Sequence, residues 1–312
     1  MKHVYISSCR RDGGIYHFTF EGGRLELREK TDVDRPLYSV ISEGKMYVLT
    51  RKYGENTENG ALVTFCIAND GSLTDRHAAL DTKGALPCHL AVEGKEVYAV
   101  NYDSGSIVLF PDKVVTHTGK GTNTARQEAP HTHFVGLTPD KKYVLCTDLG
   151  TDTVFVYDRA LNEVSRAEVP AGSGCRHLCV TNDLVYCLNE LSSDVSVFSF
   201  RDGRLSPLGT YAAIPGFGGE TYAAAIRTYE GHLYVSHRGA DCISCFDIEG
   251  KGLRLRWNAD CGGRSPHDFD IIDGYIVCAN DGGSVTVLRQ DDAGAKLVSS
   301  AEVPRPVCVT SL

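Results

Sequence analysis

Four side chains in the middle of the sequence could together bind an anionic substrate and move a proton. His133 and Glu190 supply an imidazole and a carboxylate, either of which can act as a general base. Arg176 and Arg238 supply guanidinium groups, whose fork geometry matches a carboxylate or a phosphate. These residue types favour proton transfer beside an anion, and they give four candidate catalytic residues: His133, Arg176, Glu190 and Arg238.

Five further residues at comparable places are candidates for substrate binding. Each lies close to the start or the end of a short apolar run. A polar residue at such a place can equally be a turn former or a surface charge, so each one alone has a structural explanation. Considered together with the first four, they favour a polar pocket that orients a small ligand. The candidates are His131, His177, His237, His267 and Arg264.

The elements that must position these residues belong to an internal repeat. An apolar run, a polar turn and a second apolar run recur seven times, at intervals of roughly 40 to 50 residues, the period of a four-stranded propeller blade. The runs are rich in β-branched and aromatic residues and are bounded by Gly, Asp and Asn, as expected for strands. The sequence therefore predicts an all-β fold, a seven-bladed β-propeller that spans residues 1–312 as one domain.

The two ends of the chain complement each other. A third apolar element precedes each pair of runs, and its last copy, residues 306–310, has no second strand after it because the chain stops. Residues 2–7 form a second-strand pattern that lacks a first strand. We expect these two segments to pair and to complete one blade, which leaves no open edge in the ring.

This topology predicts that the candidate residues meet. In a blade the first strand lines the channel and the second runs antiparallel beside it, so the start of the first and the end of the second lie at the same end of the channel. His133 and Arg176 stand at starts of first strands, whereas Glu190 and Arg238 stand at ends of second strands. We expect all four to converge on one mouth of the channel.

Composition narrows the class of protein. A net charge of −8, spread along the chain, argues against a nucleic-acid partner. The N-terminus lacks the features of a signal peptide and no apolar run is long enough to span a bilayer, so we expect no membrane partner and a cytoplasmic location. Cys242 and Cys245 lie three apart on an expected strand and would point to opposite faces. We expect no metal and no cofactor.

At these residues the sequence resembles the bacterial propeller-type 6-phosphogluconolactonase family, which is close in fold to the fungal carboxymuconate cyclases. The resemblance covers the whole chain and is most specific in five segments, residues 130–134, 148–152, 176–178, 188–193 and 238–241. It implies hydrolysis of a small anionic sugar lactone, with 6-phosphogluconolactone as the expected substrate. It also implies that the family's proposed active-site positions match four residues: His133, Arg176, Glu190 and Arg238.

Some positions depart from the family pattern, and two other functions stay open. The family often has Pro at position 175, a Glu and a His around residues 223–226 and Pro-Arg at 266–267, where this sequence has Cys, an Ala-rich run and Pro-His. One alternative is a muconate-type lactonising cyclase. The other is a non-catalytic propeller that binds a protein or a sugar. An exposed apolar and aromatic top face, with Glu190 and Arg176 locked in a pair, would favour the non-catalytic propeller.

Overall fold

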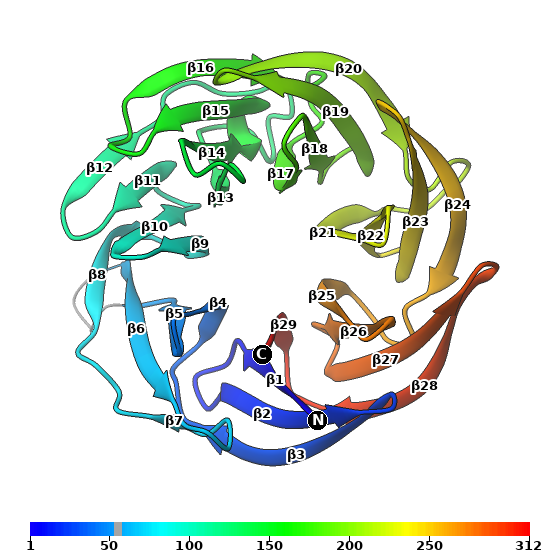
Figure 1. The fold of residues 1–312 in the computed structure, drawn as a ribbon. Coiled ribbons are helices and arrows are strands. Elements are labelled where there is room, and N and C mark those ends of the chain that lie inside the picture. The colour runs from blue at the N-terminus through cyan, green and yellow to red at the C-terminus, as the bar shows by residue number, and fades with distance from the viewer. Residues whose placement is uncertain (53–57) are drawn as a thin grey trace.

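The chain forms a ring of β-sheets arranged around a common axis (Figure 1). The computed structural model describes residues 1–52 and 58–312, and in it seven antiparallel sheets follow one another around the ring. The predicted all-β, seven-bladed β-propeller is confirmed. Within the described residues one short 3-10 turn, Leu149–Thr151, interrupts the strands. No helix in this part of the chain is long and apolar enough to cross a bilayer.

Each blade runs from an innermost strand at the axis to an outermost strand at the rim. In that order the first three blades are β29 (Pro306–Ser311), β1 (Lys2–Ser8), β2 (Gly14–Glu21) and β3 (Arg24–Thr31); β4 (Pro36–Ser42), β5 (Lys45–Thr50), β6 (Asn59–Ile67) and β7 (Leu73–Thr74), with β8 (Leu80–Ala85) also paired to β6; and β9 (Pro87–Glu93), β10 (Glu96–Asn101), β11 (Ser106–Leu109) and β12 (Lys113–Thr116).

The other four blades have four strands each. They are β13 (Thr132–Leu137), β14 (Tyr143–Asp148), β15 (Thr153–Asp158) and β16 (Glu163–Glu168); β17 (Cys175–Val180), β18 (Leu184–Asn189), β19 (Asp194–Arg201) and β20 (Arg204–Ala212); β21 (Tyr222–Tyr229), β22 (His232–Arg238), β23 (Cys242–Glu249) and β24 (Gly252–Asp260); and β25 (Pro266–Ile272), β26 (Tyr275–Asn280), β27 (Ser284–Asp291) and β28 (Gly294–Glu302).

The two ends of the chain close one blade together, as predicted. The C-terminal strand β29 pairs antiparallel with the N-terminal strand β1, with Val4 opposite Ser311 and Ser7 opposite Cys308. Figure 1 shows both termini in this blade. The pairing joins the last blade to the first and removes the sheet edge that an unpaired terminal strand would expose.

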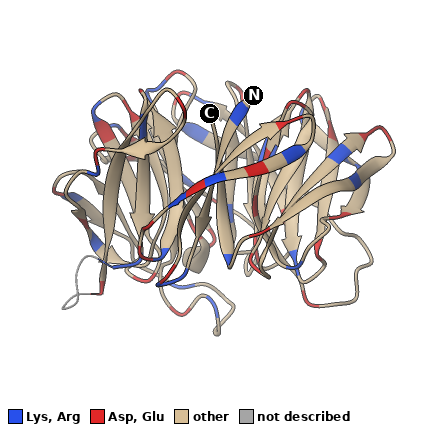
Figure 2. Ribbon diagram, turned by 90° about the horizontal axis from the view of Figure 1, so that it is seen from below, with Lys and Arg blue, Asp and Glu red and all other residues tan. Residues whose placement is uncertain are grey.

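The core lies between neighbouring blades. Inner strands such as β14 and β18 are buried along most of their length, whereas outermost strands such as β3 and β16 are mostly exposed. One apolar cluster joins Leu145 and Val156 of one blade to Val185 and Phe198 of the next. Charged side chains of both signs are interspersed on the outer strands and loops (Figure 2). Packing between blades thus holds each innermost strand in place around the axis.

The chain enters several innermost strands through a residue with left-handed backbone conformation. Arg35, Leu86, Ser265 and Arg305 have φ values of 44°, 53°, 60° and 49°, and each directly precedes the first residue of such a strand. Gly174 takes the same place before β17, with φ of 67°, and an added Cβ there would lie 2.7 Å from Leu191 Cγ. This recurring turn fixes the point at which each innermost strand begins.

Candidate active site

Six of the seven innermost strands turn one side chain into a common cavity by skipping one residue in their pairing. In β13, Thr132 pairs with Asp148 and Phe134 pairs with Thr147, which leaves His133 without a partner. A bulge of this kind re-aims the extra side chain. The skipped residues all line the cavity: Leu37, Cys88, His133, Arg176, His267 and Val307.

In most blades the end of the second strand also supplies a residue to the cavity wall. Two consecutive residues there have different roles. Asn189, at the end of β18, donates to Asp194 Oδ1 at 2.6 Å and to Ser196 Oγ at 2.9 Å in the next strand outward. The following residue, Glu190, lines the cavity. Since side chains alternate along an extended chain, one residue anchors the blade and the next faces the axis. The residues that face the cavity in this way are Cys9, Arg51, Tyr102, Glu190, Arg238 and Asp281.

The cavity has a volume of about 300 Å³ and carries a surplus of positive charge. Its wall contains five guanidinium groups and three carboxylates, which gives a formal charge of +2 in a chain whose net charge is −8. Pockets of this size hold small ligands, and a local field of one sign attracts ligands of the other. The charged residues of the wall are Arg51, Arg126, Arg176, Arg238 and Arg305, with Glu190, Asp268 and Asp281.

Glu190 is held by three of these arginines. Its Oε2 lies 2.5 Å from Arg176 Nη1 and 3.1 Å from Arg238 Nη2, and its Oε1 lies 2.7 Å from Arg126 Nη2. The side chain is 3% exposed. Burial by itself would raise the pKa of Glu190, but the charges of Arg238 and Arg176 hold that pKa well below its usual range. Glu190 is therefore a carboxylate at neutral pH, and both of its oxygens are occupied.

The neighbouring blade fixes Arg176 from the other side. Its Nε donates to the carbonyl of Ala224 at 2.7 Å, and its own carbonyl accepts a hydrogen bond from Thr147 Oγ1 at 2.6 Å. In β21 the skipped pair is Ala224 and Ala225, so a backbone carbonyl takes the place of a side chain at this point of the ring. The Ala-rich run, which departs from the family pattern, thus serves as an acceptor for Arg176.

His133 lies beside this cluster as a neutral imidazole. Its Nε2 contacts Arg176 Nη1, and its buried Nδ1 has no hydrogen-bond partner among the described residues. Burial, followed by the charge of Arg176, lowers the pKa of His133 well below its ordinary value. A neutral imidazole can accept a proton, so His133 is suited to enter a reaction as a base.

Two of the five predicted substrate-binding residues also line the cavity. His177 packs against His133, with ring centroids 5.2 Å apart, and burial lowers its pKa well below the ordinary value. His267 Nδ1 donates to Val307 O at 2.8 Å, and burial lowers the pKa of this ring to about 3. Both rings are neutral at physiological pH and offer hydrogen bonds, not charge, to a ligand.

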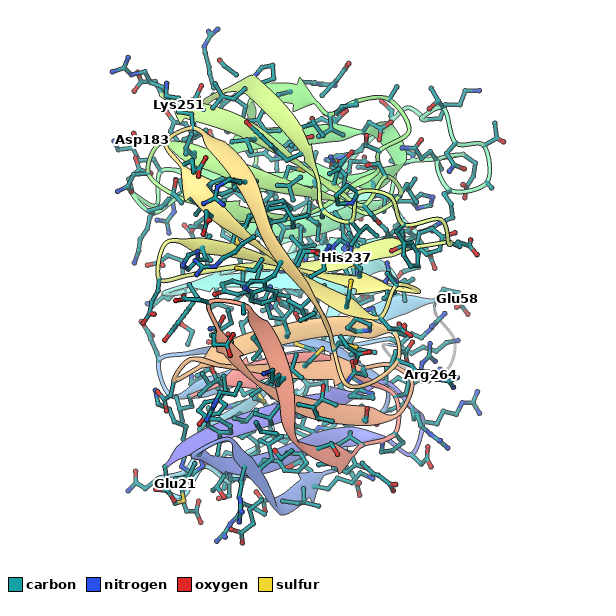
Figure 3. All side chains as sticks on the ribbon, turned by 90° about the vertical axis from the view of Figure 1, so that its right-hand side faces the viewer. Glu21, Glu58, Asp183, His237, Lys251 and Arg264 are labelled. Atoms are coloured by element: carbon teal, nitrogen blue, oxygen red, sulfur yellow. The ribbon has the colours of Figure 1, made fainter. Side chains whose placement is uncertain are left out.

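The other three predicted substrate-binding residues lie outside the cavity wall. His131 stacks on Tyr102, with ring centroids 4.4 Å apart, and its Nδ1 lies 3.1 Å from Tyr102 O. His237 occupies the anchoring position at the end of β22, where its Nε2 lies 2.9 Å from Ser244 Oγ. Arg264 is exposed, and Figure 3, which views the ring from its side, shows it near one face of the ring while His237 lies nearer the middle. Side chains alternate along the strand, so His237 points away from the cavity and the next residue, Arg238, faces it.

The sequence analysis missed Arg126, which contacts Glu190 more directly than Arg238 does. Arg126 lies on the loop between β12 and β13, outside the repeat, so no periodic signal marked it. Gln127, fully buried, fixes this loop by donating to Leu149 O at 2.8 Å and accepting from Asn123 N at 2.9 Å. Arg51 and Tyr102 were missed too, although a search for the residue following each second strand would have found both.

Comparison with known proteins places this chain in one family. The model of the family described as "Lactonase, 7-bladed beta-propeller" matches residues 3–311. The 6-phosphogluconolactonase of Bacillus subtilis is 29% identical over 99% of this chain and 97% of its own length, and an uncharacterized protein of Staphylococcus epidermidis is 32% identical over 94% of each. The crystal structure of a putative 6-phosphogluconolactonase from Bacteroides fragilis has a TM-score of 0.89 and 25% identity, covering 100% of this chain and 98% of that one. This chain belongs to the lactonase family of seven-bladed β-propellers.

Proposed function

We propose that this protein hydrolyses a small anionic sugar lactone, 6-phosphogluconolactone, to the open-chain acid 6-phosphogluconate in the cytoplasm. The observation that carries the proposal is the cavity wall, where three arginines gather around one ionised carboxylate next to a neutral imidazole. Family membership and the similarity to the B. subtilis 6-phosphogluconolactonase support the substrate class. All twelve cysteines are free, which is typical of a reducing compartment.

The proposed reaction is attack of water on the lactone carbonyl. The carbonyl oxygen becomes an oxyanion, which Arg176 and Arg238 stabilise through charge-assisted hydrogen bonds. His133 accepts the proton that water loses as the new C–O bond forms. Collapse of the tetrahedral intermediate breaks the ring C–O bond, and the resulting alkoxide takes the proton back from His133. The step uses water alone as co-reactant, and the product is the hydroxy acid.

Glu190 serves in this proposal as the residue that positions the arginines. Either Glu190 or His133 could act as the base on sequence grounds. The three ion pairs of Glu190 occupy both of its carboxylate oxygens, so the proposal assigns the role of base to His133. Without Glu190 the guanidinium groups would repel one another and would lose the geometry that stabilises the oxyanion.

One observation favours a second candidate, a non-catalytic binding propeller. Glu190 and Arg176 do form the close pair that was expected for such a protein. The other expected feature, an exposed apolar and aromatic top face, has less support. Most large apolar side chains that are exposed in the described part of the chain lie on outer strands, as Leu27, Val114, Val164, Leu208 and Leu297 do. This distribution favours the lactonase over the binding propeller.

Turnover on a panel of lactones tests the proposal. 6-Phosphogluconolactone, glucono-δ-lactone and a muconolactone would be followed at neutral pH, with the spontaneous hydrolysis of each subtracted. The proposal predicts enzyme-dependent hydrolysis that is fastest for the phosphorylated sugar lactone. Turnover of the muconolactone alone would assign the cyclase reaction, and no turnover of any lactone by a folded preparation would assign the binding propeller.

A further inference from the structure

The cavity has a second positive region on the side of the ring that faces Glu190. Arg51 directly follows β5, whereas Glu190 directly follows β18, and Figure 1 shows these strands on opposite sides of the common axis. Arg51 lines the same cavity, and its side chain is exposed. The proposed hydrolysis takes place at Glu190 and leaves this opposite region without a role.

Arg51 differs from the other arginines of the wall because it has no charged partner among residues 1–52 and 58–312. Arg126, Arg176 and Arg238 share Glu190, and Arg305 lies 3.1 Å from Asp281. Arg51 has no ion pair with any residue in the described part of the chain. Its backbone is nevertheless fixed, because its N–H donates to Arg35 O at 3.2 Å. A guanidinium group that lines a cavity can form charge-assisted hydrogen bonds with an external anion.

Arg305 directly precedes β29, in the blade next to that of Arg51, and it lines the cavity together with its partner Asp281, so this region keeps one positive charge in excess. Cys9 is held by Arg305: it is 5% exposed, and its N–H donates to Arg305 O at 3.0 Å. Burial raises the pKa of the Cys9 thiol, while the charges of Arg305 and Arg51 act in the opposite direction. Cys9, Arg51 and Arg305 all line the same cavity.

We propose that Arg51, with Arg305 beside it, binds the phosphate of a phosphorylated lactone whose carbonyl lies at Glu190. This inference rests on the proposed function and names the group that selects its substrate. A phosphate is doubly charged and loses less hydration at an exposed rim than in a buried site. The arginine fork matches its oxygens. A neutral lactone would use the Glu190 region alone.

Binding of the reaction products tests the inference without requiring turnover. Calorimetry would compare 6-phosphogluconate with gluconate in the wild type, in Arg51→Gln and in Arg51→Lys. The wild type is expected to bind 6-phosphogluconate more tightly. Losing one charge-assisted contact corresponds to about a tenfold to hundredfold loss of affinity, which is expected in Arg51→Gln for 6-phosphogluconate only. Arg51→Lys, which keeps the charge, is expected to recover part of that loss.

Arg35→Gln is the matched control. Arg35 lies on the same rim and its charge also acts on Cys9, but it is paired with Asp34 at 2.6 Å and is not part of the cavity wall. The substitution removes the same charge and should leave the preference for 6-phosphogluconate unchanged. Melting temperatures of all variants confirm that each is folded.

Three results would overturn the inference. These are equal binding of both acids by the wild type, equal weakening of both in Arg51→Gln, and an effect of Arg35→Gln as large as that of Arg51→Gln. The last would mean that general charge, and not a phosphate contact, sets the preference. Failure of the proposed function would give a different result. In that case no lactone would be hydrolysed, but the preference for 6-phosphogluconate over gluconate would still depend on Arg51.

Discussion

Two buried carboxylates lie on the wall of the same cavity, and their surroundings differ in charge. Glu190 contacts three arginines, which hold its pKa well below the usual range although burial opposes them. Asp268 contacts one arginine, Arg227, at 2.7 Å and accepts from Val309 N at 3.0 Å. Burial raises the pKa of Asp268 despite Arg227.

The charges around Asp268 balance, whereas those around Glu190 do not. Asp268 and Arg227 cancel, so this pair needs no further ligand, and its net contribution to stability is small because desolvation offsets attraction. Around Glu190 two positive charges remain unbalanced. Like charges held together in a partly buried site repel one another, which favours an arriving anion. The Glu190 region is therefore the one suited to function.

The largest effect is expected from removing the proposed base. His133→Gln removes the imidazole next to Glu190, and because loss of general base catalysis typically costs about 10²–10⁴ in rate, kcat for 6-phosphogluconolactone should fall by that factor. His267→Gln changes the corresponding neutral imidazole beside Asp268 and should alter kcat less than about tenfold. Steady-state kinetics of both variants checks this. Equal losses in the two would remove the distinction between the regions.

Arg238→Ala should have the next largest effect. Arg238 is part of the charge surplus at Glu190, and its side chain is 22% exposed, so truncation should leave the fold intact. Losing one charge-assisted contact costs about 1.5–3 kcal/mol, which corresponds to a tenfold to hundredfold fall in kcat/KM. The same fall is expected for glucono-δ-lactone, since the proposal places Arg238 at the lactone carbonyl and not at the phosphate. Unchanged kcat/KM for both lactones would show that Arg238 has no part in the reaction.

Acid should weaken the Glu190 region selectively. The pKa of Glu190 in the folded protein lies below its value in the unfolded chain, so its contribution to stability is complete above about pH 4.5 and is lost as the pH falls toward the folded-state pKa. Thermal unfolding between pH 7 and pH 3 should therefore show a gap in Tm between wild type and Glu190→Gln that narrows below about pH 4.5. A gap that stays constant over this range would contradict the lowered pKa.

The smallest effect is expected at the balanced pair. Asp268→Asn removes the cost of burying a charge and leaves an Arg227 side chain that is 26% exposed and can be hydrated, so the free energy of unfolding should change by no more than about 1.5 kcal/mol. Urea unfolding measures this change, and kcat should stay close to that of the wild type. A loss of about 3–5 kcal/mol, typical of a broken buried ion pair, would place Asp268 among the residues that hold the ring together.

The repeat made the architecture predictable from the sequence. Seven copies of one strand pattern gave the number of blades, and the unmatched patterns at the two ends gave the pairing of β1 with β29. Blade topology also brought His133, Arg176, Glu190 and Arg238 to one cavity. These successes depend on periodicity and strand order, which the sequence displays directly.

Which side chains line the cavity could not be predicted from the sequence at the scale of single residues. Bulges at the starts of the innermost strands decide which side chain faces the axis, and a sequence pattern does not reveal them. At the ends of second strands a shift of one residue separates an anchoring side chain, such as His237, from one that faces the cavity, such as Arg238. Arg126 reaches Glu190 from a loop whose path depends on the buried Gln127.

The most direct test of this account measures kcat and Tm on the same preparation of Glu190→Gln. The substitution keeps the shape of the side chain and removes the charge that gathers three arginines. Losing a preorganised electrostatic group costs about 10²–10³ in kcat, so hydrolysis of 6-phosphogluconolactone should fall by that factor in a variant that is still folded at the assay temperature. A lower Tm with near-normal kcat would contradict the account, because Glu190 would then hold the fold together without serving the reaction.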